Sequence, residues 1–129
     1  MIIGIGTDII KTARFADMNE RFLLRVYTPR ERAYLLGKNH VSAAGLFAAK
    51  EAVAKALGTG FKGIWPDQIE VVHDGNGRPA VLLHGQAAKV AKSLVSGISS
   101  TDRYAITLSI SHSDTDAIAF AIIEGGLRL

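Results

Sequence analysis

Cysteine is absent from this 129-residue sequence. Without it the chain can form no disulfide, no thiolate metal site and no cysteine nucleophile, and the composition fits a reducing cytoplasm. Long hydrophobic runs are also absent. The longest, residues 117–123, falls far short of the roughly 20 residues that span a bilayer. The N-terminal residues lack the basic and apolar regions of a signal peptide. We therefore expect a cytoplasmic protein with no membrane partner.

Aromatic residues are scarce, at 7%, and the net charge is only +3. The excess of basic residues allows a small basic nucleic-acid-binding domain as one hypothesis. Against it, the aromatic positions follow core patterns, so no platform for base stacking is evident and we expect no nucleic-acid partner. The chain is long enough for one domain with a real core, and we predict a single domain over residues 1–129.

The order of the predicted elements is irregular. Strands are predicted at 1–10, 104–112 and 117–123, and a hairpin at 68–84 turns at Asn76-Gly77. Helices are predicted at 11–27, at 28–38 with Thr28 as N-cap, at 40–57 with Ser42 as cap and Gly58 as end, and at 85–97. This order favours an α+β fold in which an antiparallel sheet packs against a long central helix.

The last predicted hairpin, residues 104–123, is apolar on more than one face. Either a helix of the same chain or a second copy of the chain could cover the extra face. The sequence leaves both possibilities open.

The central helix carries charge beside its apolar stripe. Lys50 lies close to the stripe of core-facing residues, and Glu51 and Lys55 form a pair four residues apart. A solvated ion pair would explain Glu51 and Lys55, but a lysine on the packing side must send its ammonium to a polar partner. A bound group with negative charge, from outside this helix, would account for both Lys50 and Lys55.

Asp8 follows the first apolar run, where an aspartate is most often a cap or turn residue. If the fold brought Asp8 near Glu51, the two carboxylates would form a hard oxygen site. Magnesium typically takes one or two protein carboxylates, with water and substrate phosphate completing its shell. The sequence has no pair of histidines at metal-ligand spacing, so it does not favour a zinc site.

Three further features allow either a structural or a binding role. Gly58 and Gly60 could admit a ligand close to the backbone, or simply end a helix. His112, in the run 109–112 at a strand end, could face a site or be structural. On a continuous helix over 11–27, one face would carry a basic row suited to docking an acidic helix, with a solvated face as the alternative: Arg14, Met18, Arg21 and Arg25. Asn19 could break this helix.

Four motifs occur together in order: GIGTDI at 4–9, FAAKEAVAKALGTG at 47–60, GRP at 77–79 and SISH at 109–112. In this respect the chain resembles the holo-[acyl-carrier-protein] synthases, the short single-domain 4′-phosphopantetheinyl transferases. The resemblance spans nearly the whole chain. It implies a magnesium-dependent transfer of the phosphopantetheine arm of coenzyme A to a serine of an acyl carrier protein. The product adenosine 3′,5′-bisphosphate is released, and the reaction serves fatty acid biosynthesis. It also implies a homotrimer with active sites between protomers.

The resemblance further implies roles for individual residues. Asp8 and Glu51 would hold magnesium, Lys55 would contact the phosphates, Glu51 or an ordered water would be the base, and the basic row would dock the carrier. The family often has arginine where this chain has Leu46, so Lys50 or Lys62 would have to compensate. A non-catalytic scaffold that docks an acidic protein is the remaining alternative. The residues expected to bind coenzyme A are Lys50, Lys55, Gly58, Thr59, Gly60, Pro79, Ser111 and His112.

Overall fold

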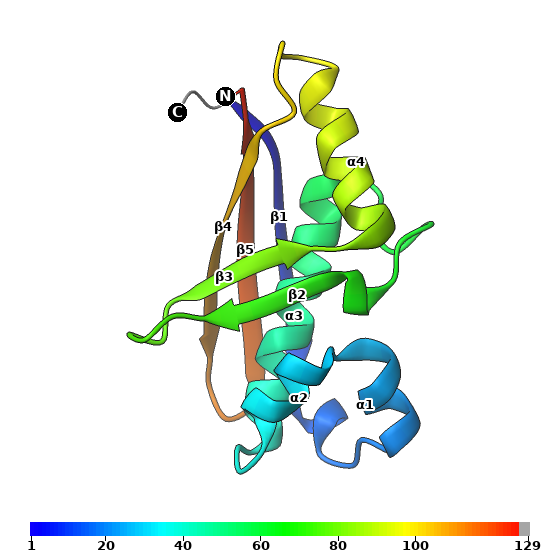
Figure 1. Cartoon of the computed structure of the whole chain (residues 1–129). Coiled ribbons are helices and arrows are strands. Elements are labelled where there is room, and N and C mark those ends of the chain that lie inside the picture. Colours follow the sequence, from blue (N-terminus) through cyan, green and yellow to red (C-terminus); the bar gives the residue numbers. More distant parts are fainter. Residues whose placement is uncertain (127–129) are drawn as a thin grey trace.

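The computed structural model describes residues 1–126 and contains two antiparallel sheets (Figure 1). The larger sheet has the strand order β1-β5-β4, and β2 and β3 form a separate two-stranded sheet. The α+β prediction is therefore confirmed. The strands are β1 (Ile2–Lys11), β2 (Ile69–His73), β3 (Pro79–Leu83), β4 (Tyr104–His112) and β5 (Asp116–Gly125). The helices are η1 (Thr12–Phe15), α1 (Glu20–Val26), α2 (Pro29–Leu35), α3 (His40–Leu57), η2 (Pro66–Gln68) and α4 (Gly85–Ser96).

Helix α3 covers one face of the larger sheet, as the central helix was expected to do (Figure 1). Alternate residues of β5 point toward it and are buried: Ala117, Ala119, Ala121 and Ile123. The helix ends at Gly58, whose φ of 85° is a left-handed conformation that glycine adopts without a Cβ penalty. The small side chains of α3 and β5 thus allow the helix to pack close to the sheet.

Two glycines of β1 make this contact unusually close. A Cβ added to Gly4 would stand 2.0 Å from the carbonyl oxygen of Ala56, and one added to Gly6 would stand 1.9 Å from that of Ala52. Real Cβ atoms cannot approach an oxygen so closely, so only glycine fits here. The close approach brings the next part of β1, including Asp8, against the middle of α3.

The predicted helix over 11–27 is wrong in its continuity. The 3-10 helix η1 stops at Phe15, and α1 begins only at Glu20. Asn19 caps α1 by accepting a hydrogen bond from the backbone N–H of Phe22 at 2.8 Å, so the chain favours a new start there. The cap of α3 also differs from prediction, because Asn39 and not Ser42 provides it. Thr28 caps α2 as predicted, in a capping box with Glu31.

Each side of the larger sheet has a different environment. Helix α3 of the same chain covers the inner face, while the outer face is exposed and apolar. Ile5, Ile9, Ile118 and Phe120 are between 42% and 66% exposed there, and the strand register places Ile9 opposite Ile118. Among residues 1–126, no helix has both the length and the apolar composition needed to cross a membrane.

Candidate active site

Asp8 and Lys55 meet at the contact between β1 and α3. The ammonium of Lys55 lies 3.1 Å from Oδ1 of Asp8 and donates to the carbonyl oxygen of Thr7 at 3.0 Å. Asp8 is not a helix cap, because β1 continues to Lys11. The Asp8 side chain is only 17% exposed, whereas that of Lys55 is half exposed. Lys55 therefore reaches from the surface to hold a carboxylate in a recess.

Glu51 shares this recess. Burial raises the pKa of its carboxyl group, and the negative charge of Asp8 raises it further, while Lys55 and Arg14 lower it. Two carboxylates that are 43 positions apart in the sequence are therefore near enough to interact electrostatically, with two cations in the same neighbourhood. The structure thus brings Asp8, Glu51 and Lys55 near one another and adds Arg14 from η1.

The chemistry of this donor set fits a magnesium ion. Two carboxylates that repel each other supply hard oxygen ligands, and a divalent cation between them would relieve the repulsion. In the described part of the chain, no group of three or more acidic or histidine side chains is arranged to hold a metal. Water and substrate oxygens would therefore have to complete the shell, which is usual for magnesium and unusual for structural zinc.

The prediction that Lys50 binds coenzyme A is wrong. Its side chain is completely buried, and its ammonium donates to Oε1 of Glu31 at 2.7 Å and to the carbonyl oxygens of Pro66 and Ile69 at 2.9 and 2.6 Å. All three donors of the ammonium are used inside the protein. Lys50 therefore joins α3 to α2 and to the segment that enters β2.

A buried polar network extends from this lysine. Glu31 also accepts from the backbone N–H of Val71 at 2.8 Å, and Thr28 donates to Glu70 at 2.5 Å. Glu70 in turn lies 3.1 Å from Nε2 of His84. Sequence reasoning did not single out Glu31 or Glu70. The capping box of Thr28 and Glu31 was a visible signal for the first, but nothing local marked the second.

Pro79 and His112 line a second recess, a cavity of about 230 Å³ between α3, β4 and the β2–β3 hairpin. Leu46 lies in its wall and is 2% exposed. Tyr34 and His73 stack there, with ring centroids 4.1 Å apart and nearly parallel planes. Burial and the charge of Lys38 lower the pKa of His73. The recess therefore offers aromatic and imidazole groups where an arginine was expected.

The predicted coenzyme A residues are not collected at one place in the chain. Asp8 and Ile110 occupy one row across the sheet, on its two outer strands, so the two recesses are about 10 Å apart on either side of β5. Gly58, Thr59 and Gly60 follow the other end of α3, about 18 Å along the helix from Leu46. Ser111 faces outward, in the row of Ile118.

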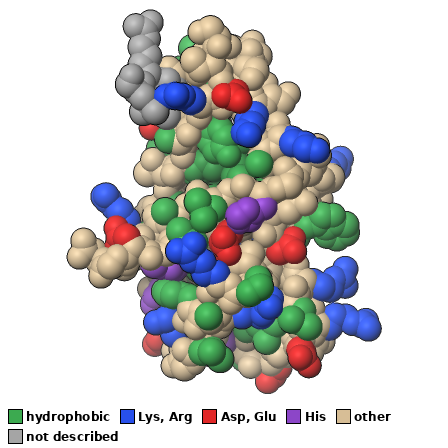
Figure 2. Space-filling model, in the orientation of Figure 1, with side chains coloured by type: hydrophobic (Ala, Val, Ile, Leu, Met, Phe, Trp, Pro, Cys, Tyr) green, Lys and Arg blue, Asp and Glu red, His purple; other side chains and the backbone are tan. Residues whose placement is uncertain are grey.

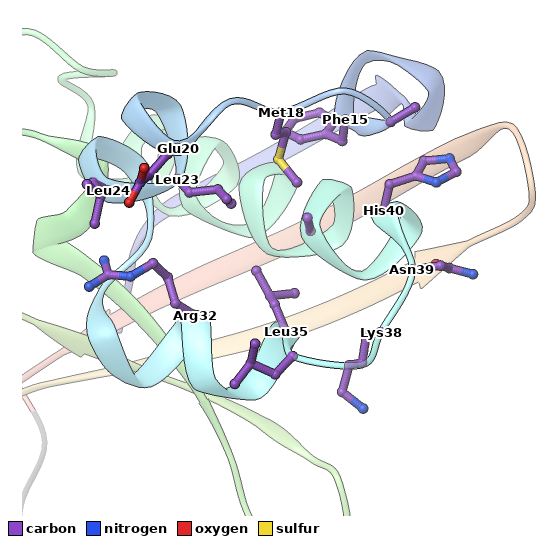
Figure 3. Close-up of a pocket in the computed structure, with 13 residues that line it drawn as sticks. Phe15, Met18, Glu20, Leu23, Leu24, Arg32, Leu35, Lys38, Asn39 and His40 are labelled. Atoms are coloured by element: carbon purple, nitrogen blue, oxygen red, sulfur yellow. The ribbon is translucent and has the colours of Figure 1, made fainter.

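The predicted docking row is also divided, because the helix that would align it is interrupted. Arg14 lies near Glu51. Met18 lies in the linking segment and points into a cavity of about 460 Å³, toward Leu35 of α2 (Figure 3). Arg21 and Arg25 line a different hollow beside η2. The four residues therefore belong to three neighbouring surfaces rather than to one helix face.

Comparison with known sequences identifies the class to which this fold and site belong. Residues 4–109 match the family model described as the 4′-phosphopantetheinyl transferase superfamily, and the chain belongs to this family. Its relatives within the family are holo-[acyl-carrier-protein] synthases. That of Clostridium perfringens strain 13 is 43% identical, over 97% of this chain and 96% of the relative. That of Halothermothrix orenii is 46% identical, over 98% of this chain and the full length of the relative.

Solved structures agree with this assignment. A holo-(acyl-carrier-protein) synthase from Bacillus anthracis in complex with CoA (3′,5′-ADP) has a TM-score of 0.78 and 34% identity, covering 98% of this chain and 99% of the other. The holo-[acyl-carrier-protein] synthase of Neisseria meningitidis has a TM-score of 0.81 and 34% identity, covering 96% and 99%. The family resemblance seen in the four sequence motifs is thereby confirmed.

Proposed function

We propose that this chain transfers the 4′-phosphopantetheine arm of coenzyme A to a serine of an apo-acyl carrier protein, within fatty acid biosynthesis in the cytoplasm. The serine oxygen forms a bond to the phosphorus that carries the pantetheine arm. The diphosphate bond breaks, and adenosine 3′,5′-bisphosphate leaves with the bridging oxygen. We assign the activity to one domain formed by residues 1–129. The observation that carries the proposal is the meeting of Asp8, Glu51 and Lys55 in one recess.

The residues of the recess suit this chemistry. Asp8 and Glu51 would hold magnesium, which when bound would offset the charge of the coenzyme A diphosphate. The ammonium of Lys55 has three donors and uses two of them on β1, so one remains for a phosphate oxygen. The nucleophile belongs to the carrier, so the chain needs none. The serine proton would be accepted by Glu51 or by an ordered water.

The recess that contains Pro79 and His112 is proposed to bind the adenosine part of coenzyme A. Tyr34 and His73 offer flat rings, and His112 offers a ring nitrogen for a phosphate. Because Lys50 is buried, it cannot replace the arginine expected at position 46. The exposed Lys62, two residues after Gly60, is the remaining candidate for that charge. The turn of Gly58, Thr59 and Gly60 and the outward Ser111 would contact the ligand from a second protomer.

A homotrimer is part of the same proposal. In one chain the two recesses lie on either side of β5, beside the two outer strands of the larger sheet, and we propose that one coenzyme A uses a recess from each of two copies. The exposed apolar face of β1 and β5 offers a surface through which copies could associate. A non-catalytic scaffold would not need Asp8 and Glu51 to be adjacent, and their adjacency favours the enzyme.

The proposal is tested by incubating an apo-acyl carrier protein with this protein, coenzyme A and magnesium chloride. Mass spectrometry should show the carrier gaining the mass of the phosphopantetheine arm. Asp8→Asn and Glu51→Gln should each reduce the rate by at least about 100-fold, with unchanged circular dichroism. A carrier that gains no mass with the wild-type protein overturns the function. Full turnover of both variants at limiting magnesium overturns the metal assignment.

A further inference from the structure

A single buried carboxylate, that of Glu31, holds three elements together. Its side chain is completely buried. Oε1 accepts hydrogen bonds from the backbone N–H of Thr28 at 2.9 Å and from the ammonium of Lys50 at 2.7 Å, and Oε2 accepts one from the backbone N–H of Val71 at 2.8 Å. Thr28 caps α2, Lys50 belongs to α3 and Val71 belongs to β2. A change at Glu31 would therefore alter the packing of all three elements.

The bond from Val71 satisfies the edge of β2 that faces α2. Val71 stands opposite Val81 in the β2–β3 register, but its N–H donates to Glu31. Val71 is only 2% exposed, so without this acceptor its N–H would be left with neither water nor a partner, which is costly. Glu31 is thus the acceptor that allows α2 to cover this edge of the strand.

This bond is the middle one of three contacts between the same two elements. The contacts are spaced three residues apart along α2 and its cap, and they are Thr28 with Glu70, Glu31 with Val71, and Tyr34 with His73. Residues three apart lie on one face of a helix. The first two contacts are buried hydrogen bonds, whereas the third is a stack of two rings that line the cavity of about 230 Å³. The two buried bonds therefore fix the position of the two rings.

The polar network that contains Glu31 reaches the surface over β2. Glu70 lies 3.1 Å from Nε2 of His84, whose side chain is half exposed. Figure 2 shows acidic, basic and histidine side chains gathered over this strand, whereas the carboxylate of Glu31 has no contact with solvent. Glu31 therefore cannot touch a ligand, and it can act on one only through the residues that it positions.

The stack of Tyr34 and His73 has one outer ring face left for a ligand. The two rings are nearly parallel with centroids 4.1 Å apart, so each covers one face of the other. The ammonium of Lys38 lies 4.7 Å from the ring centroid of Tyr34, over the face that His73 does not cover. A ligand ring that joins the stack must therefore lie on the outer face of His73, and the place of that face depends on how β2 is held against α2.

We propose that Glu31 is a positioning residue for coenzyme A, which holds β2 against α2 so that Tyr34 and His73 form the stacked wall of the recess. The inference rests on the proposed function, because it requires the adenosine part of coenzyme A to occupy this recess. It goes beyond that function by assigning the geometry of the recess to a residue that does not line it.

The product adenosine 3′,5′-bisphosphate is the probe for the test, because it carries the adenosine part without the pantetheine arm. In Glu31→Gln an amide NH2 replaces one carboxylate oxygen and cannot accept from an N–H, so α2 and β2 should separate. Isothermal titration calorimetry should show about tenfold weaker binding, at a temperature where circular dichroism shows the variant folded. KM for coenzyme A should rise by a similar factor, while kcat and KM for the carrier stay within about twofold of wild type.

Lys50→Met is the matched control. It removes the same buried ion pair but leaves Glu31 to accept from Val71, so it should lower stability and still bind the bisphosphate within about twofold of wild type. Tyr34→Leu, at a residue that is 36% exposed, should remain stable and reproduce the weaker binding. Unchanged binding in Glu31→Gln or Tyr34→Leu, or an equal loss in Lys50→Met, overturns the inference and leaves the recess assigned. A wild-type protein that does not bind the bisphosphate overturns the assignment of the recess itself.

NMR can observe the stack directly. The ring current of Tyr34 should shift the ring-proton resonances of His73 upfield, and Tyr34→Leu gives their position without the stack. In Glu31→Gln these resonances should move toward the Tyr34→Leu position, whereas in Lys50→Met they should stay at the wild-type position. Wild-type resonance positions in Glu31→Gln would show that the stack forms without Glu31, which overturns the inference.

Discussion

Two lysines of α3, five residues apart, have opposite environments. Lys50 is completely buried against Glu31, and Lys55 is half exposed against Asp8. Replacing Lys50 by methionine would leave the Glu31 carboxylate buried without its cation, at a cost of about 3–5 kcal/mol. We expect Lys50→Met to lower the urea midpoint strongly, and at temperatures where the variant is folded we expect transfer to continue.

Lys55→Met should behave in the opposite way. An exposed ion pair contributes about 1 kcal/mol or less, so the unfolding midpoint should hardly change, whereas transfer should be lost with the phosphate contact. Urea unfolding and the transfer assay on both variants provide the comparison. If Lys50→Met were as stable as wild type but inactive, the structural role assigned to Lys50 would be incorrect.

Glu70 predicts a dependence of stability on pH. Burial alone would raise the pKa of its carboxyl group, but hydrogen bonds from Thr28 and His84 and the charges of His84 and Arg30 outweigh burial, and the pKa is lowered. A carboxylate with a lowered folded-state pKa stabilises the fold above its unfolded pKa and loses this contribution as pH falls. Glu70→Gln should therefore have a lower Tm than wild type at pH 7, and the difference should shrink below about pH 4. A Tm difference that is constant with pH would contradict this role.

At the scale of elements, the contact of β1 with α3 depends on two glycines, Gly4 and Gly6, which have no side chain. Gly6→Ala would place a Cβ 1.9 Å from the carbonyl oxygen of Ala52, and the strand would have to move away from the helix. We expect a loss of about 3 kcal/mol or more in stability and, because Asp8 moves with β1, a loss of transfer. Gly75→Ala is the control, since no atom lies within 4 Å of its added Cβ. Equal stability of the two variants, measured by denaturant unfolding, would show that the contact is not so close.

The elements with simple sequence signals were predicted, and those that depend on distant partners were not. The terminal hairpin, Thr28 as cap and the end of α3 at Gly58 follow from local patterns, and the structure confirms them. Asn19 was recognised as a residue that could break the helix, but the hydrophobic spacing continues across it, so the spacing alone did not show the interruption. Lys50 was misassigned because its partner Glu31 is 19 residues away, and periodicity says nothing about which carboxylate a buried lysine will meet.

The site was predicted in the same uneven way. The proximity of Asp8 and Glu51 could be expected from their motifs, and the geometry of Gly4 and Gly6 now explains it. The recess of Pro79 and His112 could not be expected from spacing alone, because it depends on how the β2–β3 hairpin lies over α3.

At the scale of the whole molecule, the outer face of the larger sheet should determine the oligomeric state. Phe120 is 42% exposed at the centre of that face, between Ile5 and Ile9 in the facing rows of β1. Phe120→Glu should prevent association and yield a single 13.8 kDa chain in light scattering, where the wild type should show the mass of three. Thr107→Glu is the comparison variant: it places the same negative charge on β4, an outer strand of the same sheet, instead of on the central strand β5. A wild-type protein with the mass of one chain would end the trimer proposal.

The separation of the two recesses on opposite outer strands has a genetic consequence. A chain with Asp8→Asn and a chain with His112→Ala would each be inactive as a pure assembly, since every shared centre would carry one defect. In a random mixture of the two in equal amounts, the intact half of one chain should meet the intact half of its neighbour at about one centre in four. Coexpression of the two inactive variants should therefore restore about a quarter of the wild-type transfer rate. No restored transfer would mean that each chain works alone.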